Sequence, residues 1–438
     1  MSIFPYSLLM VAAIAPLVIA LASFVLRLFN LASIKSLIFD EIYYVDGARD
    51  FLKYGVEVTG SQPEFVVHPP VGKWMIASGI KLFGDNALGW RFTTALVGSL
   101  MILVVALIAH RLFYSPLLTA LASGLMAIDG LALVHSRTAL LDNFLAFFIL
   151  VATYFFISKR YWWTGLFLGL ALATKWSALY FIAIFALIAL YRAFTHHTGR
   201  DLIRPTLSRI GSLGLLPLAV YLTSWWGWFA SSRGWDRDHS SNPFASFIFY
   251  HQEMLNFHTG LSEKHPYQAN PWSWLIMGRP TSFYYQTPNT CGADSCSQEV
   301  LALGTPLLWW AGTIAIAVVF GFWIRSLIVR NFDPAVTIIV AGMAAGYLPW
   351  FFFQERTVFT FYAIVFQPFL ILALVYCARL FLTAQRRKSD RAYLVGEFVL
   401  LGVFIVMALN FIYFLPIYLG QVTTYEAWHA HMWFASWI

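Results

Sequence analysis

Long apolar windows with few charges limit the fold of this chain more than any other feature. Windows of about 20 apolar residues, each long enough for a helix to cross about 30 Å of hydrocarbon, lie near 6–29, 92–112, 117–134, 139–158, 162–174, 176–194, 210–229, 306–328, 335–353, 358–381 and 393–419. Only 11% of the residues are charged, against about a quarter in soluble domains. We therefore predict an all-α polytopic membrane protein with about eleven transmembrane helices, in which the short fifth window could form a broken helical pair with the sixth.

The loops between the windows predict the orientation. Met1 to Pro5 has no positive region and no small-residue cleavage site follows, so the first window is expected to be a retained span. Lys and Arg accumulate on the cytoplasmic side of membranes. With the N-terminus inside, every short inner loop is positive, through Arg111, Lys159, Arg160, Arg192, Arg200, Arg204, Arg209, Arg325, Arg330, Arg379, Arg386, Arg387, Lys388 and Arg391. The net charge of +7 is thus explained by topology, and no nucleic-acid partner is expected.

This orientation places two long segments of a single domain (1–438) outside, residues 30–91 and 230–305, together with the C-terminal tail. A short surface helix is expected to follow the first window and end at Gly55, and a second to begin after His68-Pro69-Pro70. The informative polar residues fall on this one face. Trp residues in the outer segments suit the headgroup region.

An acidic pair, Asp40 and Glu41, lies close to the end of the first window. Carboxylates near a bilayer are costly unless water, a partner or a function holds them there. Asp40 is the candidate for a catalytic base. The alternative is that Asp40 caps a surface helix and Glu41 is a first-turn acid, because both residue types favour helix N-termini.

Three cations are predicted at the outer turns: Arg137, Lys175 and Arg356. Three fixed cations at similar depth suggest a phosphate, which Arg and Lys bind by charge-assisted hydrogen bonds. The alternatives are an ion pair of Arg137 with Asp142, five residues later, and snorkelling of Lys175 to the surface.

Histidines in the outer segments invite a metal hypothesis. His251, His258 and His265 recur every seven residues, which is about 10.5 Å along a helix, so neighbours cannot share an ion through helical geometry. More simply, His251 and His258 lie on one helical face while His265 starts a turn. A divalent metal held by Asp40, Glu41 and His68 is conceivable, but no metal or other cofactor is expected.

The cysteines predict one cross-link. Cys291 and Cys296 lie in a loop on the oxidising outer side, so a disulfide is expected between them. Cys377 lies alone in a span and is interpreted as a packing residue.

Several motifs, in order along most of the chain, resemble the protein O-mannosyltransferases. They are Phe39-Asp40-Glu41 with Tyr43-Tyr44, His68-Pro69-Pro70 with Gly72-Lys73, Gly89-Trp90-Arg91, His135-Ser136-Arg137 with Leu140-Leu141-Asp142, Thr174-Lys175-Trp176-Ser177, and His265-Pro266-Tyr267 with Pro271-Trp272 and Trp274. The likeness is closest to the bacterial branch, because residues 230–305 are too few to contain the β-trefoil domain of the eukaryotic members. The chain departs from the family at Asp46-Gly47-Ala48, where a Lys-Asp-Ala-like run is expected.

The resemblance implies a C-type glycosyltransferase that moves mannose, with inversion, from a polyprenyl phosphate to Ser or Thr hydroxyls of secreted or membrane polypeptides. Asp40 would be the base and Glu41 would position it. Arg137, Lys175, Arg356 and Tyr362 would bind the donor phosphate, and His68, Lys73, Asp142, His258 and His265 would line the substrate site. The implied location is the plasma membrane with the active site on the outer face, near membrane lipids and the protein-translocation machinery.

Two other functions share some of these features. A related enzyme could move a different lipid-linked sugar to lipid or glycan with the same fold and acidic base. A transporter of lipid-linked sugar would also bury charges, but we find no convincing internal repeat or helix broken at the midplane. The chain length of the polyprenyl group and the acceptor proteins are not predicted.

Overall fold

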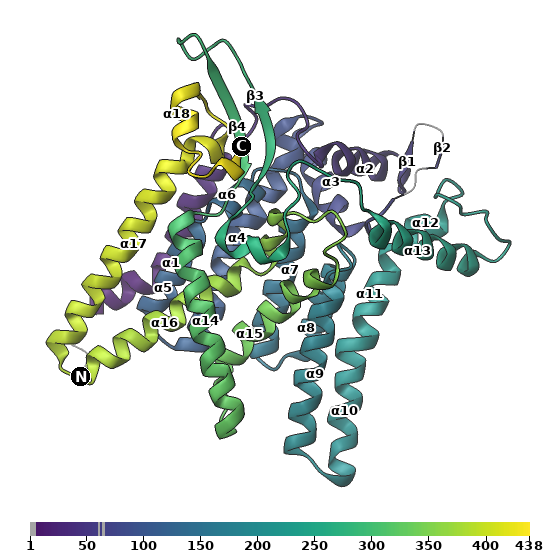
Figure 1. The fold of residues 1–438 in the computed structure, drawn as a ribbon. Coiled ribbons are helices and arrows are strands. Elements are labelled where there is room, and N and C mark those ends of the chain that lie inside the picture. The colour runs from purple at the N-terminus through teal and green to yellow at the C-terminus, as the bar shows by residue number, and fades with distance from the viewer. Residues whose placement is uncertain (1–5, 60–61, 64–65) are drawn as a thin grey trace.

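The structure, a computed structural model, describes residues 6–59, 62–63 and 66–438. The expectation for Met1 to Pro5, and residues 60–61 and 64–65 of the first outer segment, lie outside this part. The body of the molecule is a set of long helices, and the shorter elements of both outer segments gather at one end of it (Figure 1). The predicted separation into an apolar body and one elaborated face is therefore confirmed for the described residues.

Helices occupy every predicted apolar window. They are α1 (Tyr6–Leu28), α4 (Ala87–Phe113), α5 (Pro116–Ala127), α6 (Gly130–His135), α7 (Leu141–Ile157), α8 (Tyr161–Leu172), α9 (Ala178–His196), η1 (Gly199–Leu202), α10 (Ile203–Ile210), η2 (Gly211–Leu215), α11 (Leu216–Ser224), α14 (Pro306–Val329), α15 (Pro334–Gly346), η4 (Leu348–Phe352), η5 (Thr360–Val365), α16 (Gln367–Arg386) and α17 (Asp390–Leu419).

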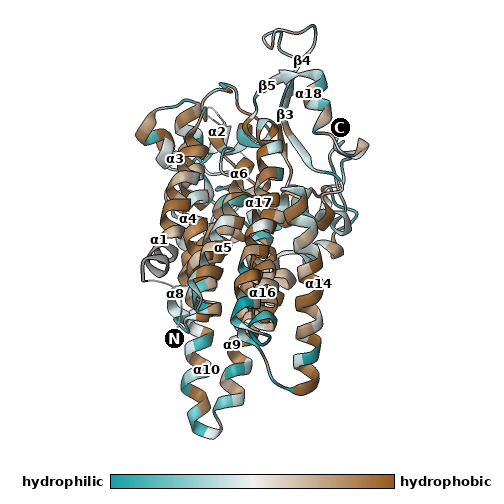
Figure 2. Cartoon of the chain, turned by 90° about the vertical axis from the view of Figure 1, so that its left-hand side faces the viewer, coloured by the Kyte–Doolittle hydropathy of each residue, from teal (hydrophilic) through white to brown (hydrophobic). Residues whose placement is uncertain are grey.

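Among the described residues, 7 helical segments are long and apolar enough to cross a membrane, and shorter apolar helices accompany them. Figure 2 shows apolar residues along the helices and polar residues at the far end of the α9–α10 pair. The number of membrane crossings remains a prediction.

Local sequence explains where these helices begin and break. The Asn86 side chain accepts hydrogen bonds from the backbone N–H groups of Leu88 and Gly89, which starts α4. Ser115 caps α5 in the same way, with Pro116 in the first turn. The predicted span 117–134 is divided because Asp129 caps a new helix, α6. The predicted span 358–381 begins as the 3₁₀ helix η5 and becomes α16 only at Gln367.

The outer elements include the two predicted surface helices. The helix after the acidic pair, α2, ends at Gly55 in the left-handed conformation (φ 73°), as expected for a glycine C-cap. The elements at this end of the molecule are α2 (Glu41–Tyr54), β1 (Val58–Thr59), β2 (Gln62–Pro63), α3 (Val71–Phe83), α12 (Trp226–Ala230), α13 (Pro243–Gly260), η3 (Pro271–Ile276), β3 (Thr281–Gln286), β4 (Cys296–Ala302), β5 (Val422–Thr424), α18 (Tyr425–Ala430) and η6 (Ala435–Trp437).

The strands correct the all-α prediction in detail, although the molecule is mainly helical. Strands β3, β4 and β5 form an antiparallel sheet in that order, so the second outer segment pairs with the C-terminal tail. The run Thr281–Gln286 is rich in Thr, Phe and Tyr and lies next to the cysteine loop, which is a recognisable hairpin signal. Cys291 and Cys296 are joined by the predicted disulfide.

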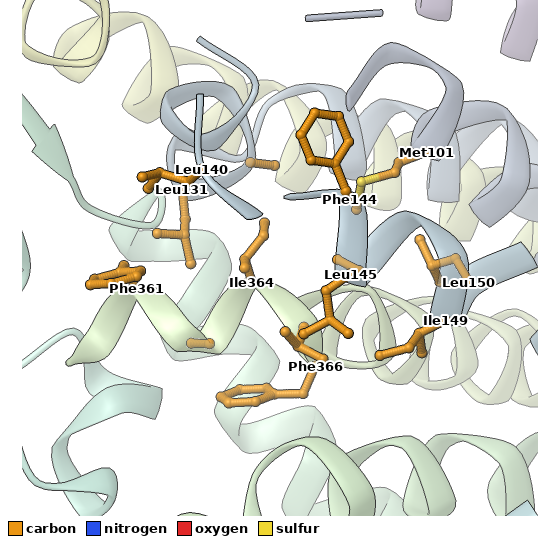
Figure 3. Close-up of a cluster of buried hydrophobic side chains, with 14 of the residues drawn as sticks. Met101, Leu131, Leu140, Phe144, Leu145, Ile149, Leu150, Phe361, Ile364 and Phe366 are labelled. Carbon is orange, nitrogen blue, oxygen red and sulfur yellow. The ribbon is translucent and has the colours of Figure 1, made fainter. Parts of the chain in front are cut away.

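A buried apolar cluster packs α4 and α7 against η5 (Figure 3). It joins Met101 of α4 and Phe144 and Leu145 of α7 to Ile364 of η5 and Phe366, which are all fully buried. Since Asp142 lies in the first turn of α7 and Arg356 shortly precedes η5, this packing sets the spacing between the two segments that carry them.

Candidate functional site

Asp40 lies at the N-terminus of α2, but its side chain makes no capping hydrogen bond to that helix within the described residues. The capping interpretation therefore does not explain the carboxylate. Its carboxylate accepts a long hydrogen bond of 3.5 Å from the Tyr44 hydroxyl, and the side chain stays partly exposed. Burial raises the pKa of Asp40 to about 6; nearby Lys175 lowers it and Asp142 raises it.

The residue before Asp40 holds an unusual backbone conformation. Phe39 has φ 48°, in the left-handed region that a bulky residue rarely adopts. Its ring stacks on Phe283 of β3 at 4.6 Å and meets Phe361 of η5 at 5.3 Å. Packing against the second outer segment and η5 thus holds the turn that presents Asp40.

Glu41 faces the opposite way from Asp40 and is fully buried. Its carboxylate pairs with Arg91 of α4 through two hydrogen bonds of 2.8 and 2.7 Å, and it also accepts the backbone N–H groups of Ile38 and Ala139. Arg91 in turn donates to the carbonyls of Ile34 and Ser36. Glu41 therefore joins the turn before α2 to α4 and to the segment that leads into α7, so its contacts hold the backbone beside Asp40.

Lys175 and Asp142 form an ion pair beside Asp40. The Lys175 Nζ donates to both Asp142 oxygens at 3.0 and 2.8 Å, and it lies 5.3 Å from the centre of the Tyr362 ring. The pair is accessible at one edge, because the side chain of Lys175 is 12% exposed. Asp142 thus pairs with Lys175 rather than with Arg137, which corrects the alternative ion pair, and Lys175 does not snorkel away.

The loop of Lys175 is held against the start of α3. The Val71 N–H donates to the Ala173 carbonyl at 2.9 Å, and a Cβ added at Gly72 would lie 2.7 Å from the Leu141 side chain and 3.0 Å from that of Thr174. Glycine at this position therefore allows α3 to pack closely on α7 and on the Lys175 turn.

The Arg356 guanidinium has a donor that no described residue uses. Its Nε is buried and has no hydrogen-bond partner in the part of the chain that the structure describes. The Arg356 charge contributes to the lowered pKa values of His68 and His258, so it lies on the same side as Lys175. A buried guanidinium nitrogen without an acceptor is costly, which suits a site that receives an anion.

Arg137 does not belong to this group. Its guanidinium donates to the carbonyls of Arg27 and Phe29, at 2.7 Å each, at the C-terminal end of α1. These carbonyls have no partner within the helix, and a cation there is favourable. The expected phosphate contact is thus replaced by a helix-capping role, which reduces the predicted set of cations to Lys175 and Arg356.

Histidines and aromatic rings form one wall of the site. The His68 ring lies 5.9 Å from Tyr44 and 5.1 Å from His258 of α13. Burial and the nearby Lys175 hold the pKa of His68 well below its usual value, and burial lowers that of His258 to about 4. Both rings are therefore neutral near pH 7 and can hydrogen-bond an uncharged ligand.

Three other predicted site residues, Lys73, His265 and Tyr362, have their contacts elsewhere or at the edge of the site. Lys73 is buried and pairs with Glu57, so it ties α3 to the segment after α2 and does not line the open site. His265 is partly exposed and its ring packs 5.1 Å from Phe359, between Arg356 and η5. Tyr362 lies in η5, a 3₁₀ helix within the predicted span 358–381, and stacks on Trp350 at 4.8 Å.

No group of three or more His, Cys, Asp or Glu side chains suited to a metal exists among the described residues. In the predicted trio of Asp40, Glu41 and His68, the Glu41 oxygens are engaged by Arg91 and two backbone N–H groups. The donor set therefore does not fit a resident metal. The arrangement offers instead a carboxylate near Lys175 that can accept a proton, and two cations, Lys175 and Arg356, that can hold an anion.

Arg91 is the clearest residue that sequence reasoning did not assign. A charged residue at the edge of an apolar window was a usable signal. The trio of Gly89, Trp90 and Arg91 was noted, yet its partner Glu41 lies 50 positions earlier, and no local pattern pairs the two.

The chain matches known proteins along most of its length. Residues 81–229 match the family described as dolichyl-phosphate-mannose-protein mannosyltransferase, and residues 243–437 match the C-terminal four TMM region of protein-O-mannosyltransferase. The polyprenol-phosphate-mannose–protein mannosyltransferase of Mycobacterium tuberculosis is 32% identical, over 96% of this chain and 90% of its own length.

Solved structures share the fold. The S. cerevisiae protein O-mannosyltransferase Pmt1-Pmt2 complex bound to the sugar donor contains a chain that superposes with a TM-score of 0.83 at 16% identity, covering 100% of this chain and 93% of that one. ArnT from Cupriavidus metallidurans bound to undecaprenyl phosphate gives a TM-score of 0.53 at 16% identity, over 92% and 76% of the two chains.

Proposed function

This chain belongs to the protein O-mannosyltransferase family, and we propose on that basis that it transfers mannose from polyprenyl-phosphate-mannose to Ser or Thr hydroxyls of proteins, with Asp40 as the general base. The observation that carries the mechanistic part is the contrast at the start of α2. Asp40 is partly exposed, makes no capping hydrogen bond to α2 and lies close to Lys175. Its neighbour Glu41 is buried in an ion pair with Arg91.

The reaction is a single displacement at the anomeric carbon. The acceptor hydroxyl forms a bond to that carbon as the bond to the phosphate oxygen breaks, and Asp40 takes the hydroxyl proton. A direct displacement inverts the anomeric centre, and a base opposite the leaving group leaves room for the acceptor. A pKa of about 6 keeps Asp40 ionised at pH 7 while making it a better base than an ordinary carboxylate.

Lys175 and Arg356 stabilise the departing polyprenyl phosphate. The leaving group is already an anion, so it needs fixed positive charge more than it needs a proton. Asp142 holds Lys175 through two hydrogen bonds, and the free Nε of Arg356 supplies a further donor. Tyr362 lies beside Lys175 and adds a hydroxyl. We propose that no metal is needed, because these cations supply the charge stabilisation.

The protein is a multi-span membrane protein, and we further propose that it lies in the plasma membrane with the site on the outer face. The basic short loops lie on the side away from the site, which supports this orientation. Secreted polypeptides would then meet Asp40 as they leave the translocation machinery.

The test measures transfer of radiolabelled mannose from polyprenyl-phosphate-mannose to a Ser/Thr-rich peptide by the purified protein. The wild type should label this peptide, but not a matched peptide with Ala at each Ser and Thr, and polyprenyl-phosphate-glucose should be a poor donor. Asp40→Asn should lower kcat by about a thousandfold, within the range for loss of a general base, without lowering the melting temperature. Equal mannose transfer by the wild type and by Asp40→Asn would support the proposed activity but show that Asp40 is not the base.

A further inference from the structure

Helix α13 contacts the segment that carries His68 at two points. The Tyr250 hydroxyl lies 2.9 Å from both the backbone N–H and the carbonyl of Val66. Two turns further along the same helix, His258 Nε2 lies 2.6 Å from the Val67 carbonyl. One face of α13 therefore fixes the backbone that leads into His68.

The same helix is joined to the Lys175 turn by a directed chain of hydrogen bonds. Trp176 Nε1 donates to the Tyr221 hydroxyl at 3.0 Å, and that hydroxyl lies 2.6 Å from His251 Nε2. His251 Nδ1 lies 2.8 Å from the Phe247 carbonyl. Since a carbonyl only accepts, the proton of His251 is on Nδ1, so Nε2 accepts from Tyr221. The donor and the acceptor of each hydrogen bond in this series are therefore assigned.

This series of hydrogen bonds connects three segments that are distant in sequence. Trp176 follows Lys175 directly, Tyr221 lies on α11, and His251 lies on α13. The Trp176 indole also packs 5.8 Å from both His251 and His258. The position of Trp176, the residue beside Lys175, is therefore set by α11 and α13, two helices that carry no proposed reacting group.

The segment after α13 reaches the third part of the site. The Leu261 carbonyl accepts the Thr357 N–H at 3.0 Å, and the Ala269 N–H donates to the Val358 carbonyl at 2.9 Å. These bonds hold the two residues that follow Arg356. The second outer segment thus contacts the segments that carry His68, Lys175 and Arg356.

We infer that Tyr221 and His251 are positioning residues that set the donor-phosphate half of the site, by fixing Trp176 and with it the ammonium group of Lys175. This inference rests on the proposed function. Neither side chain touches the reacting groups. Losing the Tyr221 hydroxyl would leave Trp176 Nε1 and His251 Nε2 without partners in a buried setting, and the turn would relax to satisfy them with water.

The test compares variants that keep ring size with variants that keep the hydrogen bond. Tyr221→Phe and His251→Phe each break the chain, whereas His251→Gln keeps a side-chain oxygen that can accept from Tyr221. Tyr285→Phe is the matched control, because it removes a phenol hydroxyl that contacts Ser297 in the outer sheet. For each purified variant we would measure KM for donor and acceptor separately, the melting temperature, and the binding of polyprenyl phosphate.

We expect Tyr221→Phe and His251→Phe to raise the donor KM and weaken polyprenyl phosphate binding by about tenfold, the effect of one lost buried hydrogen bond, with acceptor KM unchanged. The double variant should be no worse than either single variant, because both break one chain. His251→Gln and Tyr285→Phe should stay within about twofold of wild type, a small change on this scale.

Two results would overturn the inference. One is an active wild type whose donor KM and phosphate binding are unaffected by Tyr221→Phe. The other is an equal loss for donor and acceptor together with a lower melting temperature, which would indicate a purely structural role. An inactive wild type would refute the proposed function instead, and polyprenyl phosphate binding by the same proteins would still decide whether Tyr221 and His251 shape an anion site.

Discussion

Asp40 and Glu41 are adjacent, yet the first turn of α2 sends their carboxylates into opposite environments. Glu41 is fully buried and accepts from Arg91 and from two backbone N–H groups. Asp40 is partly exposed and has one long hydrogen bond, to Tyr44. A carboxylate that is saturated with donors holds structure together, while a partly exposed carboxylate with few donors is available for proton transfer. The difference between the two lies in their partners, since they carry the same functional group.

The largest expected effect comes from removing the Glu41–Arg91 ion pair. Glu41→Gln leaves the buried Arg91 guanidinium without its counter-charge, and such a loss costs about 3–5 kcal/mol of stability. We expect a clear fall in melting temperature and in the yield of folded protein, measured in detergent by thermal denaturation. Asp40→Asn is the matched control and should not lower the melting temperature.

A double-variant cycle locates that loss in the pair itself. Arg91→Ala combined with Glu41→Ala should destabilise less than the sum of the two single changes, because the second removal no longer strands a buried charge. A Glu41→Gln protein that melts like wild type but is inactive would contradict the structural role and return Glu41 to the reacting groups.

The two arginines extend the comparison from carboxylates to cations. Arg356→Gln removes a charge-assisted contact to the donor phosphate, so donor KM should rise by about ten- to a hundredfold, the range for hydrogen bonds to charged groups. Arg137→Gln removes donors from the carbonyls that end α1, so it should lower the melting temperature and leave donor KM unchanged. Steady-state kinetics at saturating acceptor separates the two. A raised donor KM in Arg137→Gln with unchanged stability would restore Arg137 to the phosphate site.

Much of this organisation could be predicted from sequence, for physical reasons. Apolar windows identify helices because length and hydropathy are local properties, and Gly55 and Pro70 marked helix boundaries through their own backbone preferences. Asp40, Lys175 and Arg356 were found because charge next to a bilayer is costly and needs an explanation.

Partner choice could not be predicted in the same way. Arg137 and Arg356 look alike in sequence. The Arg137 guanidinium donates to carbonyls at the end of α1, whereas the Arg356 Nε has no hydrogen-bond partner among the described residues. Likewise Asp142 pairs with Lys175, which is 33 positions away, rather than with Arg137 nearby. Such pairings depend on how helices pack, and spacing along the chain carries no information about them. The Tyr221–His251 chain has the same origin.

The smallest expected effect is a dependence on pH, and it sharpens the contrast because Asp40 is the proposed base. As the base, Asp40 must be ionised, so kcat/KM should fall about tenfold per pH unit below its pKa, which burial raises to about 6. Stability should respond with the opposite sign. Because the folded pKa lies above the unfolded value of about 4, the contribution of Asp40 to stability is present below pH 4 and is lost as the pH rises through 6. The melting temperature of the wild type relative to Asp40→Asn should therefore decline across the same interval in which activity rises. Activity and relative stability that rise together from pH 4 to 7 would show that Asp40 is held as an ion by its neighbours, and its desolvation would no longer explain its reactivity.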